Sequence, residues 1–301
     1  MIYTLTFNPA LDYIMTVPSC KWGEVNRTAK EKIMAGGKGI NVSIVLNNME
    51  VENTAIGFIA GFTGGEIENT LNKMGCNTDF IKLDNGFSRI NVKIKSDKET
   101  EINGQGPDIS DEAVQQLYKK FDMMHDGDTL VMAGSIPSSL PDSIYCEIMD
   151  YLKEKQMNIV VDATRDLLVN VLKYKPFLIK PNNHEIGEIF GVEISTRKQA
   201  IPYAKKMQEM GARNVLVSMA GEGAVFVGEN GEEYESEAPK GKLVNSTGAG
   251  DSMVAGFLAG YKEKQDFMHA FKMGLSAGSA SAFSEELATK EEVFNVYKTI
   301  K

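Results

Sequence analysis

Near its carboxyl end the chain has a run of small residues followed by a single acid, in the segment from Ser246 to Gly256, STGAGDSMVAG. The apolar stretch Met253–Tyr261 predicts a helix that begins here. A helix N-terminus has unpaired N–H groups and a partial positive charge, and the small residues 248–250 let an anion approach these groups closely. Asp251 would then be placed to accept the proton of a hydroxyl group, as phosphoryl transfer requires. An acid could also simply stabilise the helix N-terminus, by about 0.3–1 kcal/mol, but that role does not need the glycines.

A second glycine cluster lies near the amino end, in Ala35-Gly-Gly-Lys-Gly-Ile-Asn41. It again predicts a small-residue turn that opens a helix, with Lys38 available for an anion and Asn41 for hydroxyl groups. It is not a Walker A loop, because Gly39 follows the lysine where that loop has Ser or Thr. The chain also lacks a G-x-G-x-x-G motif after a strand, which argues against a nicotinamide-dependent oxidoreductase.

Two further clusters each follow a predicted strand. Asn182 and Glu185 are three residues apart, so their side-chain oxygens can point to one side, and Mg²⁺ prefers such oxygens together with retained waters. The same pair is equally typical of a plain helix start. The segment Ser218–Ala224, SMAGEGA, is another small-residue turn and by itself indicates only a turn.

These clusters are separated by a regular alternation of short β-branched runs and longer helical patterns. The expected strands are Tyr3–Phe7, Thr54–Ile59, Thr129–Ala133, Ile159–Asp162, Phe177–Ile179 and Asn214–Ser218. The expected helices lie near 40–49, 63–74, 110–121, 141–156, 183–190 and 197–210; a short β segment (224–227 and 232–235) and helices near 250–263, 266–284 and 290–300 follow. The alternation predicts an α/β fold with a mostly parallel sheet and helices on both faces.

Two segments, about 12–34 and 87–104, interrupt this alternation and predict a small β-sheet lid. In the second segment a hairpin has two different faces. One face carries Arg89, Asn91, Lys93 and Lys95, and the other carries Ile90, Val92 and Ile94. An isolated hairpin is marginal in water, so we expect the polar face to cover a polar ligand and the apolar face to pack on a second copy of the hairpin. The alternative is an ordinary edge hairpin packed on its own domain.

The composition limits the possible partners. With 301 residues, 43% hydrophobic and 24% charged, the chain is expected to form one α/β domain over 1–301. The net charge of −9 argues against nucleic acid or an anionic membrane as the main partner. The amino-terminal residues predict a strand rather than a signal peptide, so we expect a cytoplasmic protein. Three cysteines and three histidines, widely spaced, predict neither a zinc site nor a Ser-His-Asp triad.

The order of the motifs is an early Asp, GGKGIN, N-x-x-E, a glycine turn after a strand, and GAGD. This order resembles the PfkB-type sugar kinases of the ribokinase-like superfamily over the whole length. The resemblance implies that Asp251 is the catalytic base, with an anion hole formed by Gly248, Ala249 and Gly250. It implies a sugar-phosphate site formed by Asp12, Gly37, Lys38, Asn41, Arg89 and Ser135. It implies a nucleotide site formed by Lys180, Asn182, Ser218, Gly221, Gly223 and Ser279, with Asn182 and Glu185 organising Mg²⁺ mainly through water.

The resemblance therefore implies an ATP- and Mg²⁺-dependent kinase that acts on the 6-hydroxyl of D-fructose 1-phosphate, as a homodimer joined through the lid. Tagatose 6-phosphate or fructose 6-phosphate is the alternative substrate, with the same mechanism. A non-catalytic sugar-phosphate sensor would not need Asp251 together with a magnesium motif. One departure concerns the nucleotide turn, usually S-x-G-x-x-G, because its middle glycine is Ala220 here. We expect Gly221 to adopt the bend in its place.

Overall fold

The structure is a computed structural model and describes residues 1–163 and 165–300. Its strands in the main sheet are β1 (Ile2–Thr6), β4 (Asn53–Ala60), β5 (Asn77–Leu83), β8 (Thr129–Ala133), β9 (Asn158–Asp162), β10 (Leu178–Ile179), β11 (Asn214–Ser218), β12 (Ala224–Val227) and β13 (Glu233–Ser236). They pair in the order β13-β12-β11-β10-β9-β8-β1-β4-β5. All neighbours from β11 to β5 are parallel, and only β12 and β13 are antiparallel. The predicted mostly parallel sheet is confirmed.

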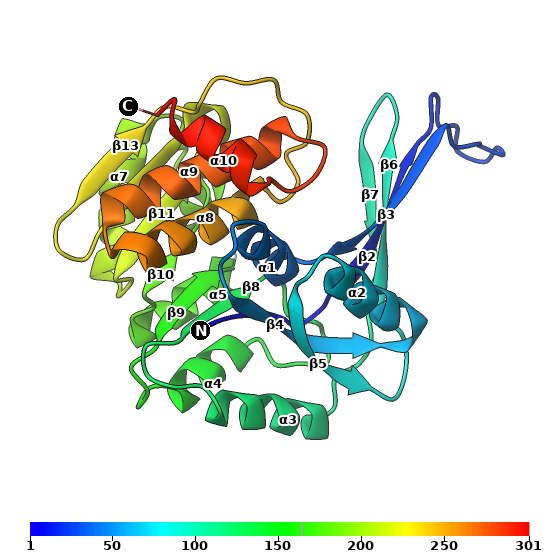
Figure 1. The fold of residues 1–301 in the computed structure, drawn as a ribbon, viewed down its shortest axis with the longest axis horizontal. Helices are drawn as coiled ribbons and strands as arrows, with labels where there is room; N and C mark the ends of the chain where they lie inside the picture. Colours follow the sequence, from blue (N-terminus) through cyan, green and yellow to red (C-terminus); the bar gives the residue numbers. More distant parts are fainter. Residues whose placement is uncertain (164, 301) are drawn as a thin grey trace.

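Helices cover both faces of this sheet (Figure 1). They are α1 (Lys38–Asn48), α2 (Gly61–Lys73), α3 (Asp111–Asp122), α4 (Ile144–Tyr151), α5 (Arg165–Val171), α6 (Asn183–Phe190), α7 (Arg197–Glu209), α8 (Ala249–Lys264), α9 (Phe267–Phe283) and α10 (Lys290–Tyr297). Helices α1, α8, α9 and α10 share one apolar core with the sheet, and α3 to α7 share another. Alternate residues of one strand enter different cores: Val160 faces the first and Val161 the second. Strands buried on both faces explain why the chain shows near-continuous β-branched runs.

The six predicted parallel strands lie within one residue of the observed ones, but two elements were not predicted. Strand β5 lies at the edge of the sheet and buries only Phe80 and Ile81, so it lacks the alternation that identifies a strand. The second, α5, is only seven residues long. The helix expected over 141–156 is shorter, because the chain turns after Tyr151. Lys155 Nζ then donates to carbonyls at the end of α3.

The lid is a separate four-stranded sheet that projects away from the main one (Figure 1). It consists of β2 (Ala10–Thr16), β3 (Lys30–Gly36), β6 (Arg89–Lys95) and β7 (Thr100–Asn103), paired in the order β3-β2-β6-β7. The hairpin β6–β7 therefore pairs with β2 and not with the edge of the main sheet. The hairpin is thus part of a four-stranded sheet and not an isolated two-stranded flap. A sheet of this width can be stable when one of its faces is covered.

The two faces of the lid differ as the hairpin sequence predicts. On the polar face, Asn91 and Lys93 are buried against Asp12 of the neighbouring strand. Lys93 Nζ lies 2.9 Å from Asp12 Oδ2, and Asn91 Nδ2 donates to Asp12 Oδ1 over 2.9 Å. On the apolar face, Ile33 and Ile102 remain 62% and 52% exposed. Apolar side chains on a sheet face are normally covered, so this face is available for a partner.

The length and hydrophobicity of the helices show whether any of them could cross a membrane. Over residues 1–163 and 165–300, none combines the length and the hydrophobicity that a membrane-spanning segment needs.

Candidate active site

The predicted clusters meet where several parallel strands end. Ser135 follows β8, Lys180 follows β10, and Ser218 is the last residue of β11. Strands β4 and β5 are added on one side of β1, and β8 to β13 are then added on its other side. The strand order therefore reverses between β1 and β8. In open α/β sheets, ligands bind outside the carboxyl ends of the strands at such a reversal.

A cavity of about 340 Å³ lies at this reversal. It is lined by the predicted residues Gly37, Lys38, Arg89 and Ser135, and also by Thr6 and Asn8 at the end of β1 and by Asn103 of the lid. The cavity is thus enclosed by the main sheet, the start of α1 and the lid. Four of the six residues expected at the sugar phosphate share one cavity.

Asp251 lies in the first turn of α8, after Gly248, whose φ of +79° is the left-handed conformation that glycine adopts readily. The Asp251 side chain is only 6% exposed, yet it is not in an apolar core. Its Oδ2 accepts a hydrogen bond of 2.7 Å from Nδ2 of Asn41 in α1. The acid near the carboxyl end of the chain and the glycine cluster near the amino end therefore meet at one point.

The surroundings raise the pKa of Asp251 to about 6. Burial is the main cause, and the nearby charge of Asp162 adds to it. The hydrogen bond from Asn41 and the charges of Lys38 and Lys180 act in the opposite direction and offset part of the increase. Asp251 is therefore still ionised at pH 7 but is a stronger base than an ordinary aspartate.

Asp162 is a site residue that the sequence analysis missed. It ends β9, is 1% exposed, and lies between two lysines: Lys38 Nζ is 2.9 Å from Oδ1 and Lys180 Nζ is 3.6 Å from Oδ2. Burial alone would raise the pKa of Asp162, but Lys180 and Lys38 together lower it below the ordinary value. The available signal was its place at the carboxyl end of the buried run NIVVD, where parallel sheets position functional side chains.

Lys38 is the first residue of α1. It lines the 340 Å³ cavity and also pairs with Asp162, so it belongs both to the cavity and to the charged cluster around Asp251. Burial alone would lower its pKa, but the charges of Asp162, Asp251 and Glu185 raise it above the ordinary value. Lys38 is therefore a permanent cation beside the cavity. The preceding Gly37 has a φ of +128°, and a Cβ atom there would lie 2.9 Å from the methyl group of Thr6. Only glycine fits at this turn.

The two lid residues of the predicted site behave differently. Arg89 lines the cavity, and its Nε donates over 3.1 Å to the main-chain oxygen of Asn8. Asp12 does not line the cavity, and its carboxylate is held by Lys93 and Asn91 within the lid. The structure thus brings Arg89 to the cavity and places Asp12 in the polar face of the lid.

On the nucleotide side, Asn182 and Glu185 form a capping box at the start of α6. The Asn182 side chain accepts from the Glu185 N–H, and Glu185 Oε2 accepts from the Asn182 N–H, each over 2.8 Å. Asn182 also lies beside Ser218, since the two form an isolated β-bridge. In the described part of the chain, no group of three or more His, Cys, Asp or Glu side chains is arranged to hold a metal ion directly.

Close packing explains the small residues around α8. A Cβ atom on Gly250 would lie 3.2 Å from Lys180 Nζ, so a larger residue would compete with this ammonium group. A Cβ atom on Gly278 of α9 would lie 3.0 Å from the carbonyl oxygen of Ala249. Ser279, the next residue of α9, is therefore close to the start of α8 and is half-buried.

The expectation that Gly221 adopts the bend of the nucleotide turn is wrong. Ala220 itself has a φ of +46°, whereas Gly221 does not have a left-handed backbone and has no neighbouring atom near its Cβ position. The bend falls at residue 220 because the Met219 N–H donates to the carbonyl of Gly223 and closes the turn there. Gly223 has a φ of +98°, and a Cβ atom on it would lie 2.0 Å from the carbonyl oxygen of Ser236.

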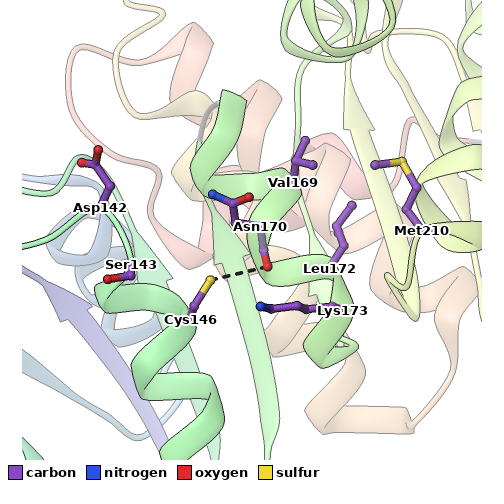
Figure 2. Close-up of a pocket in the computed structure, with 8 residues that line it drawn as sticks. All are labelled: Asp142, Ser143, Cys146, Val169, Asn170, Leu172, Lys173 and Met210. Carbon is purple, nitrogen blue, oxygen red and sulfur yellow. Dashed lines mark hydrogen bonds between the residues drawn. The ribbon is translucent and has the colours of Figure 1, made fainter.

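A second cavity, of about 780 Å³, lies elsewhere on the molecule (Figure 2). It is lined by Asp142, Ser143, Cys146, Val169, Asn170, Leu172, Lys173 and Met210, none of which belongs to the predicted clusters. Cys146 Sγ donates to the carbonyl oxygen of Asn170 over 3.4 Å, and burial raises the pKa of the thiol. This cavity is larger but holds neither of the glycine turns nor the acid and lysines gathered around Asp251, so the smaller cavity beside Asp251 is the candidate active site.

Comparison with known proteins agrees with this geometry. The family model described as pfkB family carbohydrate kinase matches residues 6–292. A 1-phosphofructokinase of Bacillus subtilis is 47% identical over 100% of this chain and 99% of its own length. A D-tagatose-1-phosphate kinase of Bacillus licheniformis is 35% identical over 95% of this chain and 94% of its own. The structure of phosphofructokinase-2 from Escherichia coli superposes with a TM-score of 0.93 at 23% identity, covering 99% of both chains. The chain belongs to the PfkB family of carbohydrate kinases.

Proposed function

We propose that this PfkB-family kinase transfers the γ-phosphoryl group of ATP to the 6-hydroxyl of D-fructose 1-phosphate, giving D-fructose 1,6-bisphosphate and ADP. One observation carries the proposal. Asp251, with its pKa raised to about 6, lies at a glycine-rich helix N-terminus and is hydrogen-bonded to Asn41 beside the cavity that Lys38 and Arg89 line. The full-length similarity to 1-phosphofructokinase supports the choice of substrate.

In the proposed reaction the Asp251 carboxylate accepts the proton of the 6-hydroxyl as the oxygen attacks the γ-phosphorus atom and the bond to the β-phosphate oxygen breaks. The main-chain N–H groups at residues 248–250 and the positive end of α8 stabilise the phosphoryl group during transfer. Lys38 and Lys180 add positive charge on opposite sides of Asp162. Catalysis by positioning and charge stabilisation is what phosphoryl transfer needs.

We further propose that the sugar phosphate occupies the 340 Å³ cavity, with its phosphate group facing Arg89 and Lys38. Gly37 and Ser135 line the same cavity. Asn41 does not line it but donates a hydrogen bond to Asp251 beside it. Asp12 does not line this cavity, and we propose that it reaches a sugar hydroxyl from the polar face of the lid once the sugar is bound. ATP would lie over the carboxyl-terminal half, on Lys180, Asn182, Ser218, Gly221, Gly223 and Ser279.

The residues present fit a magnesium ion bound mainly through water. Asn182 and Glu185 supply oxygen atoms, and Glu185 is close enough to Lys38 for its charge to raise the pKa of that lysine. Asp162 Oδ2 is buried and has no hydrogen-bond partner among the described residues, so it can accept from a bound water. When bound, the ion would offset negative charge on the ATP phosphates.

D-Tagatose 1-phosphate is a second candidate substrate, because a full-length relative is a kinase for it. Fructose and tagatose differ only in the configuration at C4. The test is ADP release by the purified protein with ATP and, in turn, fructose 1-phosphate, tagatose 1-phosphate, fructose 6-phosphate and tagatose 6-phosphate. We expect the highest kcat/KM with fructose 1-phosphate. A higher kcat/KM with another sugar phosphate would replace the proposed substrate, and no ADP release with any of them would overturn the kinase proposal.

We also propose that the protein is a homodimer in which the apolar faces of two lids pack together, and that it is cytoplasmic, where ATP is available. The exposed Ile33 and Ile102 lie on this face beside Val92, in register across β3, β2, β6 and β7. A second copy supplies an identical apolar surface, and twofold contacts of this kind are the commonest in oligomers.

A further inference from the structure

Asn8 lies where the chain passes from the main sheet into the lid. It follows β1, lines the 340 Å³ cavity and is 7% exposed. Its side-chain Nδ2 donates over 2.7 Å to the carbonyl oxygen of Gln105, where the chain returns from the lid. Its main-chain oxygen accepts over 3.1 Å from Nε of Arg89, the first residue of β6. One residue thus joins the entry to the lid, the exit from the lid and the lid arginine.

The orientation of the Asn8 amide follows from chemistry. A carbonyl oxygen only accepts hydrogen bonds, so the atom facing Gln105 must be the nitrogen. The other atom, Oδ1, is then buried and without a hydrogen-bond partner among the described residues. A buried acceptor without a donor is unfavourable, so this orientation is retained for the contact with Gln105 and not because it satisfies both polar atoms of Asn8.

Gly106 makes room for this arrangement. It has a φ of +89°, and a Cβ atom on it would lie 2.3 Å from Asn8 Oδ1. Any side chain at residue 106 would therefore displace the Asn8 amide. Glycine, which has no side chain, therefore occupies the position where the exit from the lid passes Asn8.

We propose that Asn8 is a positioning residue for the sugar-phosphate site: its side chain ties the two connections of the lid together, and this tie holds in place the main-chain oxygen of residue 8 that orients Arg89 over the cavity. The inference rests on the proposed function, because it assigns Arg89 to the phosphate of the sugar. Since the two hydrogen bonds of Asn8 go to Arg89 of the lid and to Gln105 at the exit from the lid, loss of its side chain weakens binding of the sugar phosphate and leaves ATP binding nearly unchanged. A merely structural asparagine would affect both substrates alike.

The first test compares Asn8→Ala with Asn214→Ala. Asn214 is a matched control, because its Nδ2 also donates over 2.7 Å to a main-chain carbonyl, that of Phe177, at the opposite end of the strands. We expect Asn8→Ala to raise KM for fructose 1-phosphate at least tenfold and to change KM for ATP less than twofold. We expect Asn214→Ala to leave the ratio of the two KM values unchanged. A rise of less than threefold in KM for fructose 1-phosphate, or an equal rise for both substrates, overturns the proposal.

A second pair of variants tests the same contact without changing Asn8. Gly106→Ala pushes a methyl group against Asn8, whereas Gly127→Ala introduces a similar backbone strain, at a φ of +83°, with no atom within 4 Å. We expect only Gly106→Ala to raise KM selectively for fructose 1-phosphate. Equal effects of the two alanines on that KM would show that backbone strain, and not Asn8, is responsible.

Thermal unfolding separates this inference from the proposed function. A ligand that binds only the folded state stabilises it by RT ln(1 + [L]/Kd), so a tenfold loss of affinity removes most of the Tm shift when the ligand concentration is near the wild-type Kd. Wild type should be stabilised by fructose 1-phosphate and by ATP separately, and Asn8→Ala should lose most of the first shift and keep the second. No shift of wild type with fructose 1-phosphate would contradict the proposed function. Equal shifts of wild type and Asn8→Ala would contradict only the role of Asn8.

Discussion

Asn41 Nδ2 donates a hydrogen bond of 2.7 Å to Asp251 Oδ2, although 210 positions separate the two residues in the chain. The bond joins α1 and α8, each of which begins at a glycine with a positive φ. Two helix N-termini are therefore held at one site, with Lys38 at the start of one and Asp251 at the start of the other. Two converging positive helix ends suit a reaction in which negative charge moves between phosphates.

Replacing the acid itself is the most direct test of the mechanism. We expect Asp251→Asn to lower kcat by about 10²–10⁴, the usual contribution of a positioned base. Because burial raises the pKa of Asp251 in the folded protein, its ionised form opposes folding above pH 6, and the variant should be more stable by about 1–3 kcal/mol at pH 8. Steady-state kinetics and urea unfolding check the two effects. A variant that keeps more than half of the wild-type turnover would remove Asp251 from the mechanism.

The pH dependence of activity should report the same group. Asp251 accepts a proton only when it is ionised, and its pKa of about 6 lies above the ordinary value for aspartate. We therefore expect kcat/KM for fructose 1-phosphate to be constant near pH 7.5 and to fall tenfold for each unit of pH below about 6. The measurement is a pH–rate profile at saturating ATP. A profile that stays flat down to pH 4.5 would mean that Asp251 is not the titrating base.

Arg89 is expected to bind the phosphate of the sugar and not ATP. Removing a charge-assisted hydrogen bond weakens binding by about 1.5–3 kcal/mol, so Arg89→Ala should raise KM for fructose 1-phosphate by about 10- to 100-fold. KM for ATP should change little. Lys95→Ala is the matched control, because Lys95 lies on the same face of β6 at its far end. If Arg89→Ala raised the KM values for both substrates equally, Arg89 would not be the residue that binds the phosphate of the sugar.

The left-handed conformation of Ala220 predicts a stabilising substitution. A residue with a Cβ atom is disfavoured there by about 1–2 kcal/mol, whereas glycine is not, so Ala220→Gly should stabilise the fold by about 1 kcal/mol. Ala200→Gly, inside α7, should instead destabilise it by about 1 kcal/mol or more. Urea unfolding of both variants is the measurement, and destabilisation by Ala220→Gly would contradict the assigned backbone conformation.

The proposed dimer can be tested at the apolar face of the lid. A glutamate at residue 33 would place a charge in the interface, so Ile33→Glu should shift the protein from dimer to monomer in sedimentation equilibrium. Met123→Glu is the control, because Met123 is 61% exposed, almost the same as Ile33, but lies at the end of α3 away from the lid. Wild type that sediments as a monomer at micromolar concentration would refute the interface.

Much of the fold could be predicted because its signals are local. The run Ile159–Asp162 and its counterparts are β-branched since they are buried on both faces, and the helices between them carry their own start signals, such as the Asn182 capping box. Strand β5 could not be predicted in the same way. Its place at the edge of the sheet allows polar residues and removes the alternation.

The amino-acid sequence by itself determined the two glycine turns, the acid of the GAGD motif and the two-faced lid hairpin, because turn chemistry and side-chain alternation depend on neighbouring residues. Tertiary structure alone decided which side chains share the site. It placed Asp162 between Lys38 and Lys180, paired Asp12 with Lys93, and left the bend of the nucleotide turn on Ala220. The raised pKa of Asp251 was also decided by the tertiary structure. Asp251 is buried and lies close to the charge of Asp162 only after strands and helices distant in the chain have packed together.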